Sequence, residues 1–310
     1  MKKIDFYNST NLKSYNLDSG MRYQLSVIQH LDHLTRIHSE NVANLVCRIC
    51  EYLKCKKDFT IYSTICAYLH DIGKIFIPKE ILAKDGPLTA EEFEIMKTHT
   101  TLGFEMCMKD PKLSPYADGP LYHHEGLNGS GYPNGVTQKE IPYVAQIIRV
   151  ADEYDAIVTK RHYTTHVNIS ETLKELIKDT EPNAKSVAFD MLARDYKVGK
   201  INPTILHALF KVVIDDTYYE ISGIMDYIDY LKEQVKRLQT IQKYEEKMLN
   251  SQKEKDINYY REGMRLLLSK GEDFNNYKQI LSEYEQAVVI REGIKDKLYE
   301  EIKIIKKLKI

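Results

Sequence analysis

The sequence lacks the features that would direct it to a membrane or to a nucleic acid polymer. No uninterrupted apolar run reaches the length of a membrane-spanning helix, and none follows the basic start of the chain. Lys+Arg 44 nearly balance Asp+Glu 45, so the formal net charge is -1 and no global field favours a polyanion. We therefore expect a globular cytoplasmic protein, without membrane insertion or a nucleic acid polymer as partner, whose anion binding is local.

Cysteine is also scarce. The five cysteines are an odd number and cluster mostly in one helical segment, which argues against a secreted disulfide framework. Cys47 and Cys50 form a C-x-x-C pair, but neither a second ligand pair for zinc nor a strand-to-helix context for redox chemistry accompanies them. We predict reduced cysteines within helices.

Strand patterns are missing as well, and helical periodicity dominates. From 21 to 57 apolar residues recur at steps of three and four, which predicts one or two amphipathic helices. A second helix over 59–73 is expected to end near Gly73, because glycine can adopt the left-handed backbone that ends helices. These patterns predict an all-α protein.

Two further helices are predicted before residue 160. Thr89 and Glu92 have the spacing of a capping box, so a helix running through His99 and Gly103 should follow. The segment 138–159 reads as the next helix.

The chain divides by composition into a short N-terminal segment, 1–20, a domain over 21–213, and a helical tail over 214–310. Apolar residues of the tail alternate steps of three and four, as in a coiled coil: Ile221, Ile224, Ile228, Leu231, Val235 and Leu238. Glycines are expected to divide the tail into several helices: Gly263, Gly271 and Gly293. We predict that 221–241 supports a homodimer or docks a protein partner.

Histidines and aspartates gather at predicted helix ends and beside loops. The set comprises His38, His70, Asp71, His99, His123, His124 and Asp152. A lone histidine on an apolar face is most often a core residue, but adjacent His-Asp and His-His pairs offer nitrogen ligands and a carboxylate that can bridge two cations. Seven groups exceed what one tetrahedral zinc needs, and two octahedral metals sharing a carboxylate fit the number.

A pair of cations suits hydrolysis of a phosphodiester or phosphate ester, because together they activate a water and hold the phosphoryl oxygens. Lys74 follows Asp71 by one turn and could place a positive charge on a non-bridging oxygen. The alternative for Lys74 is a solvated surface lysine.

Four motifs then carry a family resemblance. They are "HDIGK" (70–74), "MKTHTTLG" (96–103), "HHEGLNGSGYPNG" (123–135) and "VADEYDAI" (150–157). In this order and spacing the chain resembles the HD-GYP family, a subgroup of the HD-domain metal-dependent phosphohydrolases, over roughly residues 22–213.

The resemblance implies an all-α helical bundle that hydrolyses cyclic di-GMP to pGpG or GMP. It implies two divalent metal ions, iron or manganese, with one held by His38, His70, Asp71 and Asp152 and the other by Asp71, His99, His123 and His124. Lys74 matches the lysine that contacts the scissile phosphate, so Asp71 and Lys74 would be catalytic.

The resemblance also implies substrate contacts from Lys74, Tyr132, Arg149 and Arg161. Glycines 129, 131 and 135 should let the Tyr132–Pro133 turn lie beside the metals.

The sequence departs from the family where Leu34 replaces a glutamate for a third metal. It also has Gly126-Leu127-Asn128 in place of Arg-Trp-Asp, and Gln146 in place of an arginine, with Arg149 one turn further along as the expected substitute.

Other readings stay open. The bundle could be a nucleotide sensor or interaction module, or an HD hydrolase acting on cyclic GMP-AMP or another nucleotide. Glu125 is expected to be either an acceptor for a ligand histidine or a solvated loop carboxylate, and Asp155 to be scaffolding. The remaining histidines are taken as structural or surface residues: His30, His33, His166 and His207.

Overall fold

The computed structural model describes residues 30–162, 169–181 and 198–308, and for 159–162 it describes the backbone alone. Helices make up the regular structure of these ranges, and their single β-type pairing is an isolated bridge between Asn128 and Thr137. The predicted all-α class is confirmed. Within the described ranges, no helix has both the length and the apolar character needed to cross a bilayer.

The chain divides into two compact units, Met1–Val213 with Leu308–Ile310, and Ile214–Lys307. The first unit contains α2 (His33–Tyr52), α3 (Lys57–Leu69), η3 (Ile72–Phe76), α4 (Lys79–Leu82), α5 (Ala90–Lys97), α6 (His99–Lys109), η4 (Ser114–Tyr116), α7 (Asp118–Tyr122), α8 (Tyr143–His162), α9 (Ile169–Lys178) and the start of α10 (Pro203–Leu249).

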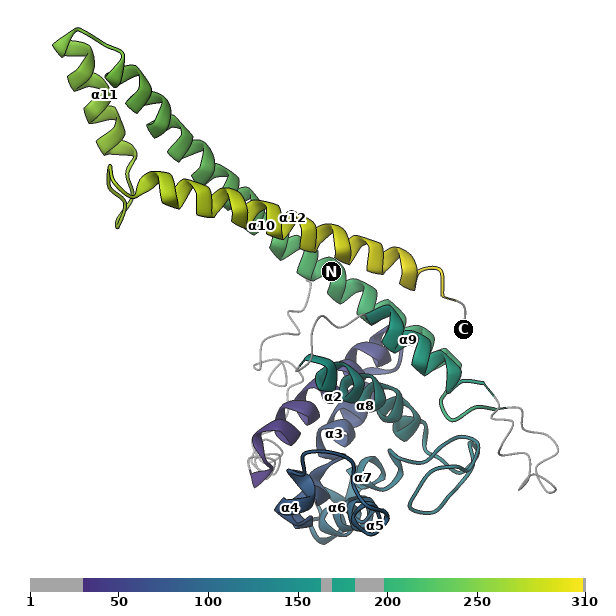
Figure 1. Ribbon diagram of the computed structural model, residues 1–310. Coiled ribbons are helices and arrows are strands. Elements are labelled where there is room, and N and C mark those ends of the chain that lie inside the picture. Colours follow the sequence, from purple (N-terminus) through teal and green to yellow (C-terminus); the bar gives the residue numbers. More distant parts are fainter. Residues whose placement is uncertain (1–29, 163–168, 182–197, 309–310) are drawn as a thin grey trace. The chain divides into compact units, whose positions relative to one another are not determined.

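Helices α2, α3 and α8 pack against one another and form the centre of the first unit (Figure 1). Helix α2 begins where the Asp32 side chain accepts hydrogen bonds from the backbone N–H groups of Leu34 and Thr35. It buries Val42, Val46 and other residues spaced at three and four positions, as its sequence pattern predicts. These three helices therefore provide a rigid frame for side chains that point between them.

Gly73 does not end α3, contrary to the sequence-based expectation. The helix ends at Leu69, and Gly73 lies in η3 without the left-handed φ that a glycine cap would have. Its role is close approach, because a Cβ at Gly73 would lie 1.9 Å from the carbonyl oxygen of His99 and 2.6 Å from the backbone nitrogen of Gly103. Absence of a side chain at this position lets η3 contact the backbone of α6 directly.

Three other predicted boundaries can be compared with the structure. The capping box of Thr89 and Glu92 is confirmed. The helix expected to run through His99 is instead two helices, α5 and α6, that meet at Thr98. The helix predicted over 138–159 starts later, at Tyr143, directly after Pro142.

The second unit consists of the rest of α10 with α11 (Glu254–Leu267) and α12 (Tyr277–Ile305). Its core joins Leu238 and Ile241 of α10 to Met264 of α11 and Tyr277 of α12. Arg237 adds a bidentate ion pair to Glu272, with both N···O distances 2.6 Å. The apolar seam of α10 is thus covered at its C-terminal end by helices of the same chain.

The expectation that three glycines divide the tail is wrong for two of them. Gly263 lies inside α11 and Gly293 inside α12, whereas Gly271, with φ of 91°, lies in the connection between these helices. The five cysteines form no disulfide: Cys47, Cys50, Cys66 and Cys107 are buried within helices as predicted, whereas Cys55 lies in the connection between α2 and α3.

Candidate metal centre

The predicted ligands come from five places in the first unit and converge on one point. His38 belongs to α2 and Asp152 to α8; the other five lie at helix ends, His70 and Asp71 after α3, His99 at the start of α6, and His123 and His124 after α7. Three overlapping groups have ligand atoms within 4.8 Å of one another: His38, His70 and Asp152; His99, His123 and His124; and His70, Asp71 and His123.

The carboxylate of Asp71 lies between two of these groups. Its Oδ2 is 3.4 Å from His70 Nε2 and 3.8 Å from His38 Nε2. Its Oδ1 is 3.4 Å from His99 Nε2 and 3.9 Å from His123 Nε2. Each oxygen therefore faces a different set of histidines, which is the arrangement expected of a bridging carboxylate.

The backbone fixes the orientation of three histidine rings. The Nδ1 of His70 lies 2.6 Å from the carbonyl of Ala67, and that of His99 lies 2.6 Å from the carbonyl of Met96. His123 Nδ1 lies 2.8 Å from the carbonyl of Pro120. Because a carbonyl can only accept, Nδ1 carries the proton in each ring, and the lone pair of Nε2 points into the centre.

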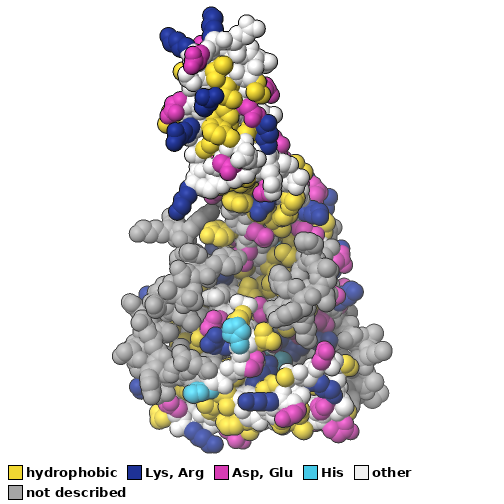
Figure 2. Space-filling model, turned by 60° about the vertical axis from the view of Figure 1, so that its left-hand side comes forward, with side chains coloured by type: hydrophobic (Ala, Val, Ile, Leu, Met, Phe, Trp, Pro, Cys, Tyr) yellow, Lys and Arg dark blue, Asp and Glu magenta, His cyan; other side chains and the backbone are white. Residues whose placement is uncertain are grey.

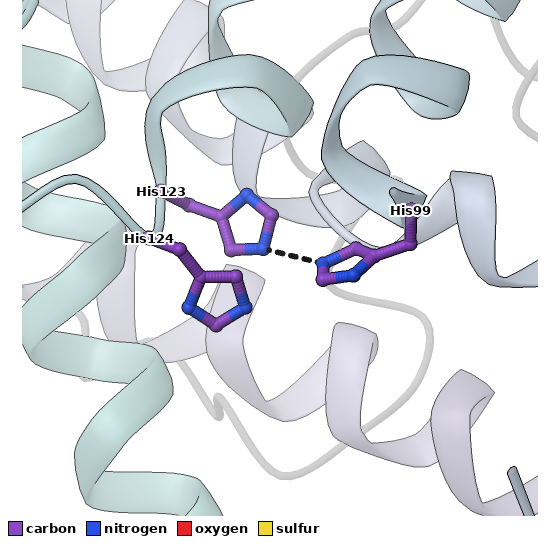
Figure 3. Close-up of side chains that lie close together, drawn as sticks. All are labelled: His99, His123 and His124. Atoms are coloured by element: carbon purple, nitrogen blue, oxygen red, sulfur yellow. Dashed lines mark hydrogen bonds between the residues drawn. The ribbon is translucent and has the colours of Figure 1, made fainter. Parts of the chain in front are cut away.

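The close pair His99 and His123 supports this reading. Their Nε2 atoms lie 3.2 Å apart, the contact drawn as a dashed line in Figure 3. Both Nδ1 atoms already donate, so a hydrogen bond between the Nε2 atoms would require a buried imidazolium. Burial lowers the pKa of His99, and it lowers that of His123 well below the usual range with help from nearby His124. A cation between the rings would satisfy both lone pairs.

His38 has a different environment. Its Nδ1 lies 2.7 Å from Asp155 Oδ2, and its Nε2 lies 2.9 Å from Asp152 Oδ1. Burial would lower its pKa, but the two carboxylates outweigh burial and raise the pKa of His38 to about 10. Asp155 thus joins α8 to α2, in keeping with the scaffolding role expected of it, and it does so through a direct bond to a predicted ligand.

Burial and charge also set the ionisation of the carboxylate and of His124. Burial would raise the pKa of Asp71, but the Lys74 ammonium and the histidines hold it well below its usual range. Burial lowers the pKa of His124 to about 3. An ionised aspartate among neutral imidazoles is the state in which these groups bind metal.

Two buried polar atoms at the centre have no hydrogen-bond partner, His70 Nε2 and Asp71 Oδ1. Leaving such atoms unsatisfied costs about 1–3 kcal/mol each. A divalent cation would satisfy both, and a mixed set of imidazole and carboxylate donors suits iron, manganese or zinc. The residues present therefore fit a divalent metal site.

The glycine-rich loop borders this centre. Gly129 and Gly135 have positive φ, 76° and 64°, while a Cβ at Gly131 would lie 2.3 Å from the Gly126 nitrogen. The loop places the ring of Tyr132 against His124, with 4.7 Å between ring centroids and 28° between planes. Tyr132 thus lies beside the candidate ligands, as the sequence predicts.

Both expectations for Glu125 are wrong. Its side chain is 1% exposed, so it is not a solvated loop carboxylate, and its bonds go to backbone and not to a ligand histidine. Its oxygens accept from the N–H groups of Asn134 and Val136, at 2.7 and 3.2 Å. Glu125 anchors the far side of the loop that carries Tyr132, and no local sequence pattern indicates these bonds.

The basic side chains expected to contact the substrate lie in different environments. Lys74 Nζ lies 2.6 Å from Asp71 Oδ2, at the centre, and so is not a solvated surface lysine. Arg149 is mostly buried and pairs with Glu153 of its own helix at 2.6 Å. The side chain of Arg161 lies outside the described part of the chain. Gln146 is buried and bonds to Ile141 and Asn202.

The positions left out of the site agree with their expected roles where they are described. Leu34 is 59% exposed. His30, His33 and His207 are exposed, as expected for surface histidines, and His166 lies outside the described residues. On the face drawn in Figure 2, basic and acidic side chains are interspersed, in keeping with the near-zero net charge.

Comparison with known proteins identifies the family. The family model described as "HD domain" matches residues 25–190. The chain belongs to the HD-domain family. This HD-domain chain is 43% identical over 150 residues to a protein of Thermotoga maritima named "Cyclic di-GMP phosphodiesterase", covering 48% of this chain and 41% of that protein. These matches confirm the resemblance drawn from the four motifs.

Two other proteins with similarity to this chain have different names. A "3'3'-cGAMP-specific phosphodiesterase 2" of Vibrio cholerae is 39% identical over 97 residues, covering 31% of this chain and 19% of that protein. A solved HDG"Y"P protein of Bdellovibrio bacteriovorus is 20% identical, with a TM-score of 0.44, covering 67% of this chain and 66% of that one. The chain spans less than half the length of the two curated relatives.

Proposed function

We propose that this HD-domain protein is a cyclic dinucleotide phosphodiesterase that hydrolyses cyclic di-GMP to pGpG, GMP or both. The observation that carries the proposal is the position of Asp71, with one oxygen facing His38 and His70 and the other facing His99 and His123. Relatives named for cyclic di-GMP hydrolysis support the choice of substrate.

The proposed cofactors are two divalent ions, iron or manganese, that share Asp71. One would be held by His38, His70 and Asp152, and the other by His99, His123 and His124, the two histidine-rich groups already described. When bound, such ions lower the pKa of a water and neutralise charge on phosphoryl oxygens.

Protein groups supply orientation and charge around the reacting phosphate. Carbonyl oxygens behind His70, His99 and His123 hold the proton on Nδ1, so these rings present Nε2. Lys74 carries a charge that burial would remove but that Asp71 stabilises, since the pKa of Lys74 is raised. Its ammonium is therefore available to a non-bridging phosphoryl oxygen as negative charge develops there. Tyr132 would border the substrate on the loop side.

We assign the chemistry to residues 21–213 of a cytoplasmic protein, and assembly or docking to the tail, 214–310. The 221–241 segment remains the proposed contact for a homodimer or a protein partner. Part of its seam is already buried against α11 and α12 in the same chain, so a partner would have to use the other faces of α10.

Purified protein loaded anaerobically with iron or manganese should convert cyclic di-GMP to linear product. Chromatography of the reaction mixture measures this conversion. The Asp71→Ala variant should be inactive, and the proposal fails if wild type turns over no faster than this variant. Cyclic GMP-AMP should be assayed in parallel, since one relative is named for that substrate.

A sensor or interaction module is the second candidate, because one predicted substrate cation is already engaged. The ion pair between Arg149 and Glu153 would have to break before the guanidinium could meet a phosphate. Calorimetry distinguishes the sensor from the phosphodiesterase: tight binding of cyclic di-GMP without hydrolysis, in protein loaded with either iron or manganese, favours the sensor.

A further inference from the structure

Helix α5 is unusual among the helices around the centre because none of its residues is buried. Polar contacts hold it in place: the capping box of Thr89 and Glu92, and an ion pair from Lys84 to Glu92. Phe93, in the middle of this helix, is 45% exposed. The Phe93 ring therefore remains partly open to solvent on a helix that buries none of its residues.

Phe93 contacts the loop that borders the metal centre. Its ring meets that of Tyr132 edge to face, with centroids 6.1 Å apart and planes at 82°. Tyr132 in turn stacks on His124 at 4.7 Å. Two ring-to-ring steps therefore lead from a candidate ligand to the exposed ring of Phe93.

A cation completes the group. Lys97 Nζ lies 5.6 Å from the centroid of Phe93 and 5.9 Å from that of Tyr132, within range of a cation–π contact. Lys97 also pairs with Glu94 at 2.7 Å, but the Glu94 side chain is 69% exposed, and exposed pairs of this kind contribute little. The Lys97 ammonium can therefore turn toward an incoming anion at little cost in interaction energy with Glu94.

We propose that Phe93, Lys97 and Tyr132, here called the Phe93 platform, bind a nucleobase of the substrate. The inference rests on the proposed function, which places a phosphodiester at the centre. An exposed phenylalanine alone indicates nothing. Here the exposed ring, a loop held by Glu125 and a cation lie together beside the centre, the combination that proteins use to stack bases and to contact the attached phosphate.

Stacking recognises the face of a base, which all bases share. The Phe93 platform therefore contributes affinity and does not distinguish guanine from adenine. Selection between cyclic di-GMP and cyclic GMP-AMP has to come from other contacts.

Binding of GMP and of ribose 5-phosphate, its counterpart without a base, tests the proposal in full-length, manganese-loaded protein. Wild type should bind GMP more tightly than ribose 5-phosphate. Phe93→Ala should lower the affinity for GMP on the order of tenfold, the usual contribution of one stacked base, and leave the affinity for ribose 5-phosphate unchanged. Phe93→Tyr should restore GMP binding, and Phe93→Leu should not. Ile95→Ala is the matched control, since Ile95 is 41% exposed on the same helix and outside the platform.

Equal binding of the two ligands by wild type would overturn the platform, as would equal GMP affinities in the Phe93→Ala and Ile95→Ala variants. Metal content and the thermal midpoint of each variant check that the fold is kept. The readout is independent of turnover: base-dependent GMP binding through Phe93 supports the platform even if cyclic di-GMP is not hydrolysed. In the converse case, hydrolysis with an unchanged KM in Phe93→Ala overturns the platform and leaves the proposed function standing.

Discussion

The ammonium of Lys74 lies 2.6 Å from Oδ2 of Asp71, the oxygen that also faces His38 and His70. A buried carboxylate and a partly buried ammonium thus stabilise each other's charge at the point where the candidate ligands meet. The pKa of Lys74 is raised and that of Asp71 is lowered by this contact, against the effect of burial on both.

Removing the charge of Lys74 should slow hydrolysis and leave metal binding intact. In Lys74→Met we expect kcat for cyclic di-GMP to fall about 100-fold, the typical effect of losing one group that stabilises developing charge. Metal content per chain serves as the control. A variant with wild-type kcat would remove Lys74 from the reaction.

Asp155 should tune metal affinity through His38. Removing a carboxylate that orients a ligand histidine typically weakens metal binding about 10- to 100-fold, and we expect this for Asp155→Ala in a manganese titration. Asp155→Asn should retain most of the affinity, because its amide oxygen can still accept from Nδ1–H. Glu140→Ala, which loses only a loop carboxylate bonded to Thr137, is the control. Unchanged affinity in Asp155→Ala would contradict the role.

Glu125→Gln should destabilise the protein. One of its two oxygens becomes an amide that cannot accept, so a backbone N–H of Asn134 or Val136 loses its partner at a cost of about 1–3 kcal/mol. Urea denaturation measures the change, and Glu140→Gln on the exposed side of the loop should have a smaller effect. If the two variants unfold at the same urea concentration, Glu125 does not anchor the loop.

Gly73→Ala should destabilise the first unit through a clash with backbone. The added methyl would lie 1.9 Å from the His99 carbonyl, and relieving such overpacking typically costs about 1–3 kcal/mol. Gly223→Ala, within α10 and with no atom near the added methyl, should instead be neutral or stabilise by about 0.5–1 kcal/mol. Thermal unfolding of both variants checks the contrast, and a Gly73→Ala protein as stable as wild type would exclude the close approach.

Acid should destabilise the metal-free protein in a window that reflects its buried histidines. The pKa of His124 is about 3 in the folded chain and 6.5 ordinarily, so the unfolded chain binds a proton that the folded chain excludes. The stabilisation is present above pH 6.5 and is lost as pH falls toward 3. In chelator-treated protein, His124→Asn should therefore show a shallower loss of stability between pH 6.5 and about 5, a window above the usual pKa values of Asp and Glu. An unchanged slope would contradict this.

The sequence predicted the all-α class from its helical periodicity. It also predicted the ligand residues, because adjacent His-Asp and His-His pairs at helix ends can be recognised from the sequence alone. It could not predict what holds them. Glu125 bonds to backbone atoms nine and eleven residues later, and Asp155 bonds to a histidine 117 residues earlier, so neither contact follows any local period.

Gly73 shows the limit of local rules most directly. A glycine near a helix end was read as a left-handed cap, but the requirement comes from the backbone of α6 approaching from outside. In the tail, Gly263 and Gly293 were read as breaks, yet both lie inside helices. Gly263 faces the ring of Tyr244 from α10, so tertiary packing outweighs its low helix propensity.

The His70–Asp71 pair is bracketed by Leu69 and Ile72, which both belong to the same buried apolar cluster. Metal binding and packing of the core are consequently linked. A cation that binds the folded chain and not the unfolded chain stabilises the fold, and above its dissociation constant this stabilisation grows with the logarithm of the cation concentration. Removing a bound cation would therefore destabilise the apolar core around Leu69 and Ile72 as well as the charged groups of the centre.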